Sequence, residues 1–241
     1  HWREARLNDM FMQLRWIGLA ALLLAIGLPF VFGEWSAGTA LGVFLGMWVA
    51  LGSLQHVFER IRKPGRIGGS FWGMHLAHFG MAVLVLGITG VKSFEVERDV
   101  RMSLGDTVSI APYTFRLVDM VDVNGPNYKA MQAHVEVLKN DKVVEVLYPE
   151  KRRYFSSAMP MTEAAIDSGF LRDLYVSLGD PIAGDTPSWS MRVYYKPFVP
   201  WLWAGVLMMV FGGILAALDR RYRRAAVSPL QTAGEALSST T

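Results

Sequence analysis

The sequence predicts an α-helical integral membrane protein with four transmembrane helices and one inserted, small all-β domain, either a barrel or a sandwich. Three observations lead to this fold class. Four apolar runs are each long enough to cross a hydrocarbon core as a helix. Between the third and fourth runs, about a hundred residues contain stretches that alternate apolar and polar side chains, as β-strands do. Basic residues gather at the ends of the apolar runs, which is typical of membrane proteins.

The apolar runs extend over about 16–32, 36–58, 71–91 and 198–218. Hydrophobic residues make up 52% of the 241 residues, as expected for a chain that exposes apolar surface to a lipid bilayer. In the second run, small residues recur at every fourth position, a pattern that allows two helices to approach closely: Gly38, Gly42, Gly46 and Ala50. We interpret this stripe as a helix contact and not as part of a cofactor site.

Lysine and arginine residues predict the orientation of the helices. The segments 1–15, 59–69 and 219–241 carry an excess of basic residues and are therefore predicted to be cytoplasmic, the last as a disordered tail. Alternation through four spans places residues 92–197 on the opposite side of the membrane. The basic side chains flank the spans and do not form one continuous stripe, which argues against a nucleic-acid partner.

Local patterns within 92–197 predict strands and turns. Strands are expected in five stretches, 113–117, 133–138, 143–147, 174–178 and 189–195. Asn140-Asp141 is expected to turn a hairpin, because both residue types tolerate positive φ, and residues 124–127 are expected to form a second turn. A helical turn is expected at 162–166. On such a turn, Glu163 and Asp167 would be either paired carboxylates for acid–base chemistry or part of a solvated face.

His75 and His78 are the candidate site residues, because the run 71–91 contains no Asp, Glu, Lys or Arg. Ionisable side chains inside a transmembrane helix are costly and usually face the interior of the helix bundle. The two histidines lie three residues apart and so share a helix face, and imidazole is a common axial ligand of haem iron. Spacing alone leaves two alternatives open: a metal ligand, or a histidine that hydrogen-bonds to a neighbouring helix.

The other polar residues offer weaker candidates. His56 ends the second run and is expected to form hydrogen bonds near the membrane surface, and His134 is expected to be an ordinary strand residue. The chain has no cysteine, which excludes a disulfide scaffold, a thiolate metal site and a thiol relay within it.

Four strings in the second half of the chain carry a resemblance to a known family. They are VNGPNYKAMQAHVEV, YPEKRRYF, MPMTEAAIDSGFLRDLYVSLGDP and WSMRVYYKPFVPWLWAGVLMMVFGGILAALDRRYR. Together they resemble the carboxy-terminal part of the CcmF family, the integral-membrane haem lyase subunits of bacterial cytochrome c maturation, with the paralogue NrfE as a related possibility. Several strings in the right order make this resemblance more specific than a single motif.

The resemblance implies a function in the bacterial inner membrane, with residues 92–197 in the periplasm. A haem lyase attaches haem covalently to the CxxCH cysteines of apocytochrome c. Its implied partners are the haem chaperone CcmE and CcmH/CcmI-type subunits. The family also holds a b-type haem between two transmembrane histidines. The motif LAHFG maps the second of these onto His78 as an axial ligand to the iron of haem b, whereas His75 has no family role and is a secondary candidate in the same cavity.

The resemblance also implies that this chain is catalytically incomplete on its own. The family's tryptophan-rich motif, its two periplasmic haem-binding histidines and its first transmembrane histidine belong to an amino-terminal part with no counterpart here. Two alternatives to a lyase subunit stay open. The chain could be a non-catalytic membrane scaffold that docks maturation partners, or a membrane haem or quinone electron-transfer subunit.

Overall fold

The computed structural model describes residues 7–33, 35–157 and 159–219. The described chain divides into two compact units, a helical unit and a β unit that comprises residues 90–200. The segment 1–6 and the tail 220–241, both predicted to be cytoplasmic, lie outside the described residues.

The helical unit contains four helices that are each long and apolar enough to cross a membrane, counted over the described residues. They are α1 (Leu7–Phe32), α2 (Ala37–Ile61), α3 (Gly69–Phe94) and α4 (Val199–Ala217). Large apolar side chains remain exposed along all four helices, as is expected of surfaces that face lipid. The predicted fold class, four membrane helices with one inserted β domain, is confirmed.

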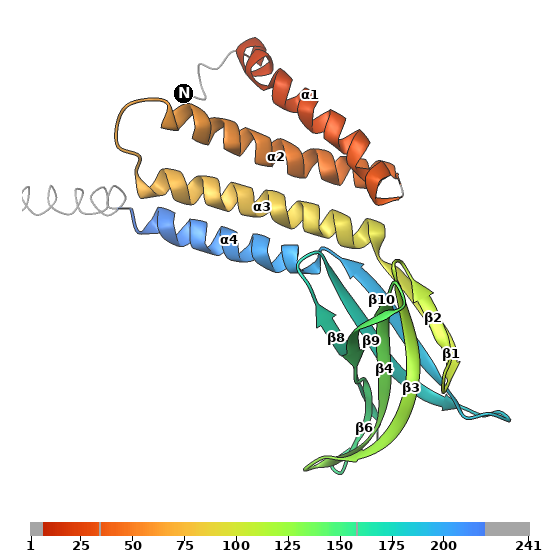
Figure 1. Cartoon of the computed structure of the whole chain (residues 1–241). Helices are drawn as coiled ribbons and strands as arrows, with labels where there is room; N and C mark the ends of the chain where they lie inside the picture. Colours follow the sequence, from red (N-terminus) through yellow and green to blue (C-terminus); the bar gives the residue numbers. More distant parts are fainter. Residues whose placement is uncertain (1–6, 34, 158, 220–241) are drawn as a thin grey trace, which may run out of the picture. The chain divides into compact units, whose positions relative to one another are not determined.

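Helix α2 packs against α3 through the predicted stripe of small residues (Figure 1). Gly42 lies against the side chain of Thr89. A Cβ atom added to Gly46 would lie 2.8 Å from Cγ of Leu86, so the two helices approach too closely for a larger residue. The interpretation of the stripe as a helix contact is therefore correct. The helix begins at Ser36, whose hydroxyl accepts a hydrogen bond from the Thr39 amide at 3.1 Å.

Helices α3 and α4 meet along a second line of glycines, which the sequence analysis did not predict. A Cβ atom on Gly80 would lie 2.7 Å from the carbonyl oxygen of Gly205, and one on Gly212 would lie 2.6 Å from the amide nitrogen of Ala77. The two backbones are thus in direct contact. At the start of α3, the Asp219 carboxylate accepts a hydrogen bond from the Ser70 amide at 2.7 Å, which satisfies one of the free amides of that helix end.

The β unit is a sandwich of two antiparallel sheets. One sheet has the order β1 (Val96–Ser103), β10 (Ser188–Pro197), β9 (Arg172–Ile182), β8 (Ala165–Ser168). The other has the order β2 (Thr107–Ile110), β3 (Tyr113–Asn124), β4 (Tyr128–Lys139), β6 (Glu150–Tyr154), β7 (Met161–Glu163), and β5 (Lys142–Leu147) also pairs with β4. Alternate residues of both sheets form one buried core that includes Phe115, Leu117, Val135, Leu174, Leu178 and Met191.

Two predicted turns are present where the sequence placed them. Asn140 and Asp141 have φ values of 52° and 58°, and they join β4 to β5 with Lys139 opposite Lys142. Positive φ at both central residues matches the right-handed twist of the flanking strands. The turn at 124–127 joins β3 to β4, and the Gly125 amide donates to the Tyr128 carbonyl at 2.9 Å.

The prediction of a helical turn at 162–166 was wrong. Residues 161–163 form β7, which pairs with β6, and residues 165–168 form β8, which pairs with β9 in the other sheet. The short segment gains strand hydrogen bonds on both sheets, which a single helical turn could not provide. Glu163 and Asp167 consequently belong to different sheets. Glu163 forms an ion pair with Arg152 at 3.4 Å and Asp167 pairs with Arg172, so they are not a carboxylate pair.

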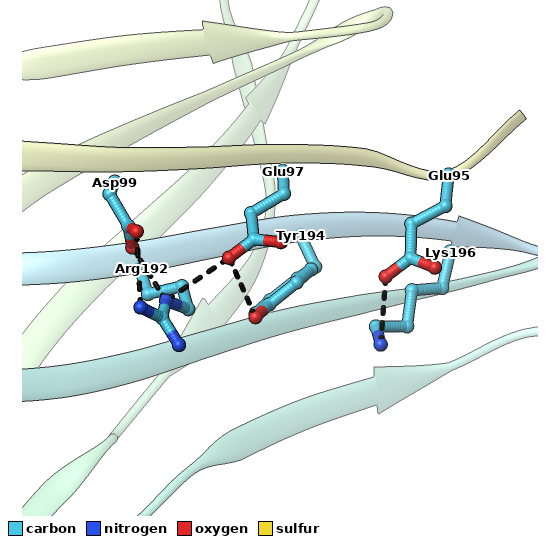
Figure 2. A network of polar contacts seen from close by, with 6 residues as sticks. All are labelled: Glu95, Glu97, Asp99, Arg192, Tyr194 and Lys196. Carbon is cyan, nitrogen blue, oxygen red and sulfur yellow. Dashed lines mark hydrogen bonds and ion pairs between the residues drawn. The ribbon is translucent and has the colours of Figure 1, made fainter.

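A ladder of charged and polar side chains joins β1 to β10, the first and last strands of the β unit (Figure 2). The Arg192 guanidinium donates to both carboxylate oxygens of Asp99, at 2.6 and 3.0 Å. The hydrogen bond from Arg192 holds the pKa of Asp99 below its usual range. Further along, the Tyr194 hydroxyl donates to Glu97 at 2.9 Å, and Lys196 pairs with Glu95 at 2.9 Å.

The glycine line between α3 and α4 gives the first prediction. We expect Gly212→Leu to lower the free energy of unfolding by about 1–3 kcal/mol, because the new side chain must displace the α3 backbone. The matched control is Gly213→Leu, since a Cβ atom at Gly213 meets nothing within 4 Å. Both changes replace a helical glycine with leucine and therefore add the same helix propensity. Thermal unfolding of the chain in detergent, followed by helical circular dichroism, measures the difference. Equal stabilities would contradict the close α3–α4 contact.

Candidate functional site

The helical unit contains a pocket of about 410 Å³ that is lined by residues of α1, α2 and α3. Its walls are mainly apolar, and they include Leu14, Ile17, Trp48, Val49 and Met74. Three histidines also line it, His56, His75 and His78. An apolar pocket with a few converging polar groups is the usual form of a site for a cofactor or small molecule.

His78 lies on an exposed side of α3, one turn after Met74. Its Nδ1 atom is 2.8 Å from the Met74 carbonyl oxygen. Because a carbonyl oxygen can only accept a hydrogen bond, Nδ1 carries the proton, and in the neutral ring the lone pair is left on Nε2. A histidine that donates one ring N–H to a backbone carbonyl and keeps the other nitrogen free has the arrangement typical of metal ligands.

His75 has a different environment, although it lies on the same helix face. Only 6% of its surface is exposed. Its Nδ1 atom is 2.8 Å from the Phe71 carbonyl oxygen, and its ring centroid is 4.0 Å from that of Phe71. The Ser53 hydroxyl of α2 donates to the His75 carbonyl at 3.3 Å. His75 is therefore held firmly in the α2–α3 contact, and it forms an inner wall of the pocket.

His56, which was expected only to form hydrogen bonds near the membrane surface, also lines this pocket. It belongs to α2, and its ring centroid is 6.2 Å from that of His75. The short connection between α2 and α3 is a sequence signal for this proximity. It makes the two helices antiparallel neighbours, so the end of α2 lies beside the start of α3. The Arg60 side chain stabilises that connection by donating to the carbonyls of Lys63 and Arg66, each at 3.2 Å.

The described residues contain no group of three or more His, Asp or Glu side chains that converges on one point to hold a bare metal ion. The three histidines share a pocket, but they do not form a metal cage. His134 lies in the β unit, half-buried on β4 with its ring centroid 4.9 Å from that of Tyr148.

Comparisons with known proteins identify the family. Residues 93–197 match the family model described as the CcmF C-terminal beta-sandwich. The chain is 43% identical over 220 residues to the cytochrome c-type biogenesis protein CcmF of Escherichia coli (strain K12), covering 91% of this chain and 34% of that protein. This chain belongs to the CcmF family. The predicted resemblance is confirmed, and the matched region of the family is carboxy-terminal.

Other members of the CcmF family give the same result. The Rhodobacter capsulatus protein ccl1, also named a cytochrome c-type biogenesis protein, is 40% identical over 243 residues, covering 98% of this chain and 37% of that protein. The NrfE protein of Haemophilus influenzae is 32% identical over 180 residues, covering 75% of this chain and 27% of that protein. This chain thus spans about a third of the length of the curated relatives it matches.

A solved structure titled "Cytochrome c Heme Lyase CcmF" has the same fold. It superimposes with a TM-score of 0.65 at 18% identity, covering 83% of this chain and 34% of the solved chain. At this identity the match shows the fold alone.

Proposed function

We propose that this chain is the carboxy-terminal part of a haem lyase that attaches haem covalently to the CxxCH cysteines of apocytochrome c in the periplasm. The names of the relatives support a function in cytochrome c maturation. One observation in the structure carries the proposal, namely His78, an exposed imidazole with a free Nε2 atom beside an apolar pocket in the membrane unit.

The residues around His78 fit a b-type haem. The hydrogen bond to the Met74 carbonyl fixes the ring orientation and leaves Nε2 as the atom that would hold the haem iron. The exposed side of α3 leaves room for a macrocycle beyond the ring, and the apolar pocket walls exclude water from its face. When bound, this haem would supply a redox centre that keeps the substrate haem reduced.

His75 and His56 have a supporting role in this proposal. His75 is buried between α2 and α3, so it positions the inner wall of the pocket and does not reach the exposed side where His78 lies. A second residue to hold this haem would come from the family's amino-terminal part. The periplasmic histidines that hold the substrate haem in the family also belong to that part.

The β unit is proposed to be periplasmic and the α2–α3 connection to be cytoplasmic, in the inner membrane of a bacterium. The basic side chains of that connection support this orientation, since Arg60, Arg62, Lys63 and Arg66 all lie within it or next to it. The β unit would then be on the side where the haem chaperone CcmE, the CcmH/CcmI-type subunits and apocytochrome c meet the lyase.

The ligand assignment is tested by replacing His78 in the full-length protein. We expect His78→Ala to reduce bound b-type haem by about tenfold or more, because an axial ligand is removed. His75→Ala should retain most of the haem, since it removes only part of the pocket wall, and His134→Ala in the β unit is the matched control. The visible absorption spectrum of the purified, reduced protein measures the effect. Exogenous imidazole should restore the spectrum of His78→Ala, and an unchanged spectrum in that variant would falsify the assignment.

The membrane orientation is tested with single cysteines, because the chain has none of its own. Pro64 and Asn127 are suitable positions, since both are exposed and lie in loops. In whole cells, a membrane-impermeant thiol reagent should label Asn127→Cys and leave Pro64→Cys unlabelled until the cells are lysed. The reverse pattern would contradict the proposed orientation.

The division of the reaction between two parts of the protein is tested by complementation. Residues 1–241 are expressed in a strain that lacks the full lyase, with or without the amino-terminal part as a second polypeptide. Joining haem to thiols requires both to be held in position, so covalent haem staining of a reporter cytochrome c is expected only with both parts. Staining with residues 1–241 alone would show that the catalytic site lies within them.

A further inference from the structure

The β unit contains a second pocket, of about 630 Å³, at one end of the sandwich. It lies between the sheet formed by β3, β4 and β6 and the opposing strand β9. Its residues play no part in the haem site proposed above, which belongs to the helical unit.

The pocket lies where the inward-facing residues of β4 change from buried apolar side chains to an exposed lysine. Val137, Val135 and Ala133 are fully buried in the core, and Met131 is partly buried against it. The next inward position along the two-residue period is Lys129, which lines the pocket and is exposed. The Trp189 indole N–H of the other sheet points to the Met131 sulfur at 3.2 Å, so the apolar core ends at this level.

The cationic side of the pocket contains two opposed like charges. Lys129 on β4 lies directly opposite Arg153 on β6. Like charges in such a position destabilise a strand pair. Neither side chain forms an ion pair with a carboxylate among the residues that the structure describes. A contribution to the stability of the fold therefore does not explain why Lys129 and Arg153 lie opposite each other.

The neighbouring cations are already neutralised. Lys151 pairs with Asp180 at 3.0 Å. Arg152 pairs with Glu150 at 2.6 Å and Glu163 at 3.4 Å. Lys129 and Arg153 are therefore the pocket cations that have no ion pair among the described residues, and the lining also includes one carboxylate without an ion pair, Asp122 of β3.

Large exposed apolar side chains lie next to pocket-lining residues along the chain. Phe155 lies two residues after Arg153 and is 69% exposed. Met159 and Met161, at 77% and 55% exposed, flank Pro160, which lines the pocket. Exposed aromatic residues, methionine and arginine are enriched in the cores of protein interfaces.

We propose that this pocket docks an extended, acidic segment of a partner protein. Carboxylates of the segment bind Lys129 and Arg153, and its apolar side chains contact Phe155 and Met159. The concave shape between two sheets favours an extended peptide chain, which can contact both sheets at once. The exposed apolar side chains favour a peptide over a small free anion, which would leave them uncovered.

The chain provides a matched control pair. Lys139 and Lys142 are also directly opposite each other, at the hairpin of β4 and β5. They do not line the pocket. Replacing either pair with glutamine removes two positive charges from cross-strand positions, but only the first pair should affect docking.

The test uses the full chain in nanodiscs of uncharged phosphatidylcholine. The probe is a fluorescein-labelled peptide of about twelve residues in which Glu alternates with Ser and Leu, and its binding is followed by fluorescence anisotropy. We expect K129Q/R153Q to raise the Kd about tenfold or more, and K139Q/K142Q to change it less than about twofold. The Kd should rise with salt concentration, and F155S/M159S should also raise it.

Three outcomes would overturn the proposal. The first is an unchanged Kd in K129Q/R153Q, and the second is equal binding of a probe in which Gln replaces Glu. The third is a fall in melting temperature of K129Q/R153Q, because removing opposed like charges should leave stability equal or higher if the pair has no structural role. Binding to phosphatidylglycerol vesicles that depends on Lys129 and Arg153, without binding of the peptide, would assign the pocket to an anionic membrane instead.

Discussion

The antiparallel pairing of β1 with β10 is the interaction on which the inserted domain depends. The chain leaves α3 at Phe94 and enters α4 at Val199, so a folded domain between these points has to bring its two ends together. The β1–β10 register does this over its whole length, from Val96 opposite Tyr195 to Ser103 opposite Ser188. The helical unit meets the same requirement in its own way, because glycines let the backbones of α3 and α4 touch.

Two histidines on one face of α3, His75 and His78, differ in burial and in the contacts that hold them. His75 is buried and held by contacts from both α2 and α3, whereas His78 is exposed and held only through its own helix backbone. A ligand to an external cofactor has to be oriented and yet reachable, and His78 meets both conditions. His75 is part of the α2–α3 packing, and its Nδ1 atom and backbone carbonyl form local hydrogen bonds with the Phe71 carbonyl and the Ser53 hydroxyl.

Charges in the β unit are also arranged in two ways. Along β1 and β10, each charged side chain in Figure 2 faces an opposite charge or a hydroxyl across the strand pair. The charges of this ladder are therefore neutralised within it. Single exposed pairs of this kind contribute little to stability, but together they favour one register. At the end pocket, Lys129 faces Arg153 instead. The β1–β10 ladder pairs opposite charges, whereas Lys129 and Arg153 are like charges. Binding of an acidic group from another molecule therefore explains the Lys129–Arg153 pair better than a contribution to stability does.

The sequence by itself determined the four spans, the β character of the insertion, the Asn140-Asp141 hairpin and the histidine helix. These follow from local properties: hydropathy over a helix length, two-residue alternation, and tolerance of positive φ. Only the tertiary structure decided the roles of residues that depend on partners far along the chain. The segment around residues 162–166 forms strands β7 and β8 because β7 pairs with β6 in one sheet and β8 pairs with β9 in the other. His56 lies near His75 because α2 folds back along α3. The small residues of the α3–α4 contact recur along each helix, but only the packed helices show that Gly73 and Gly80 of α3 lie against α4. Local patterns specify which element forms, but the exposure and neighbours of a side chain are set by what packs against that element.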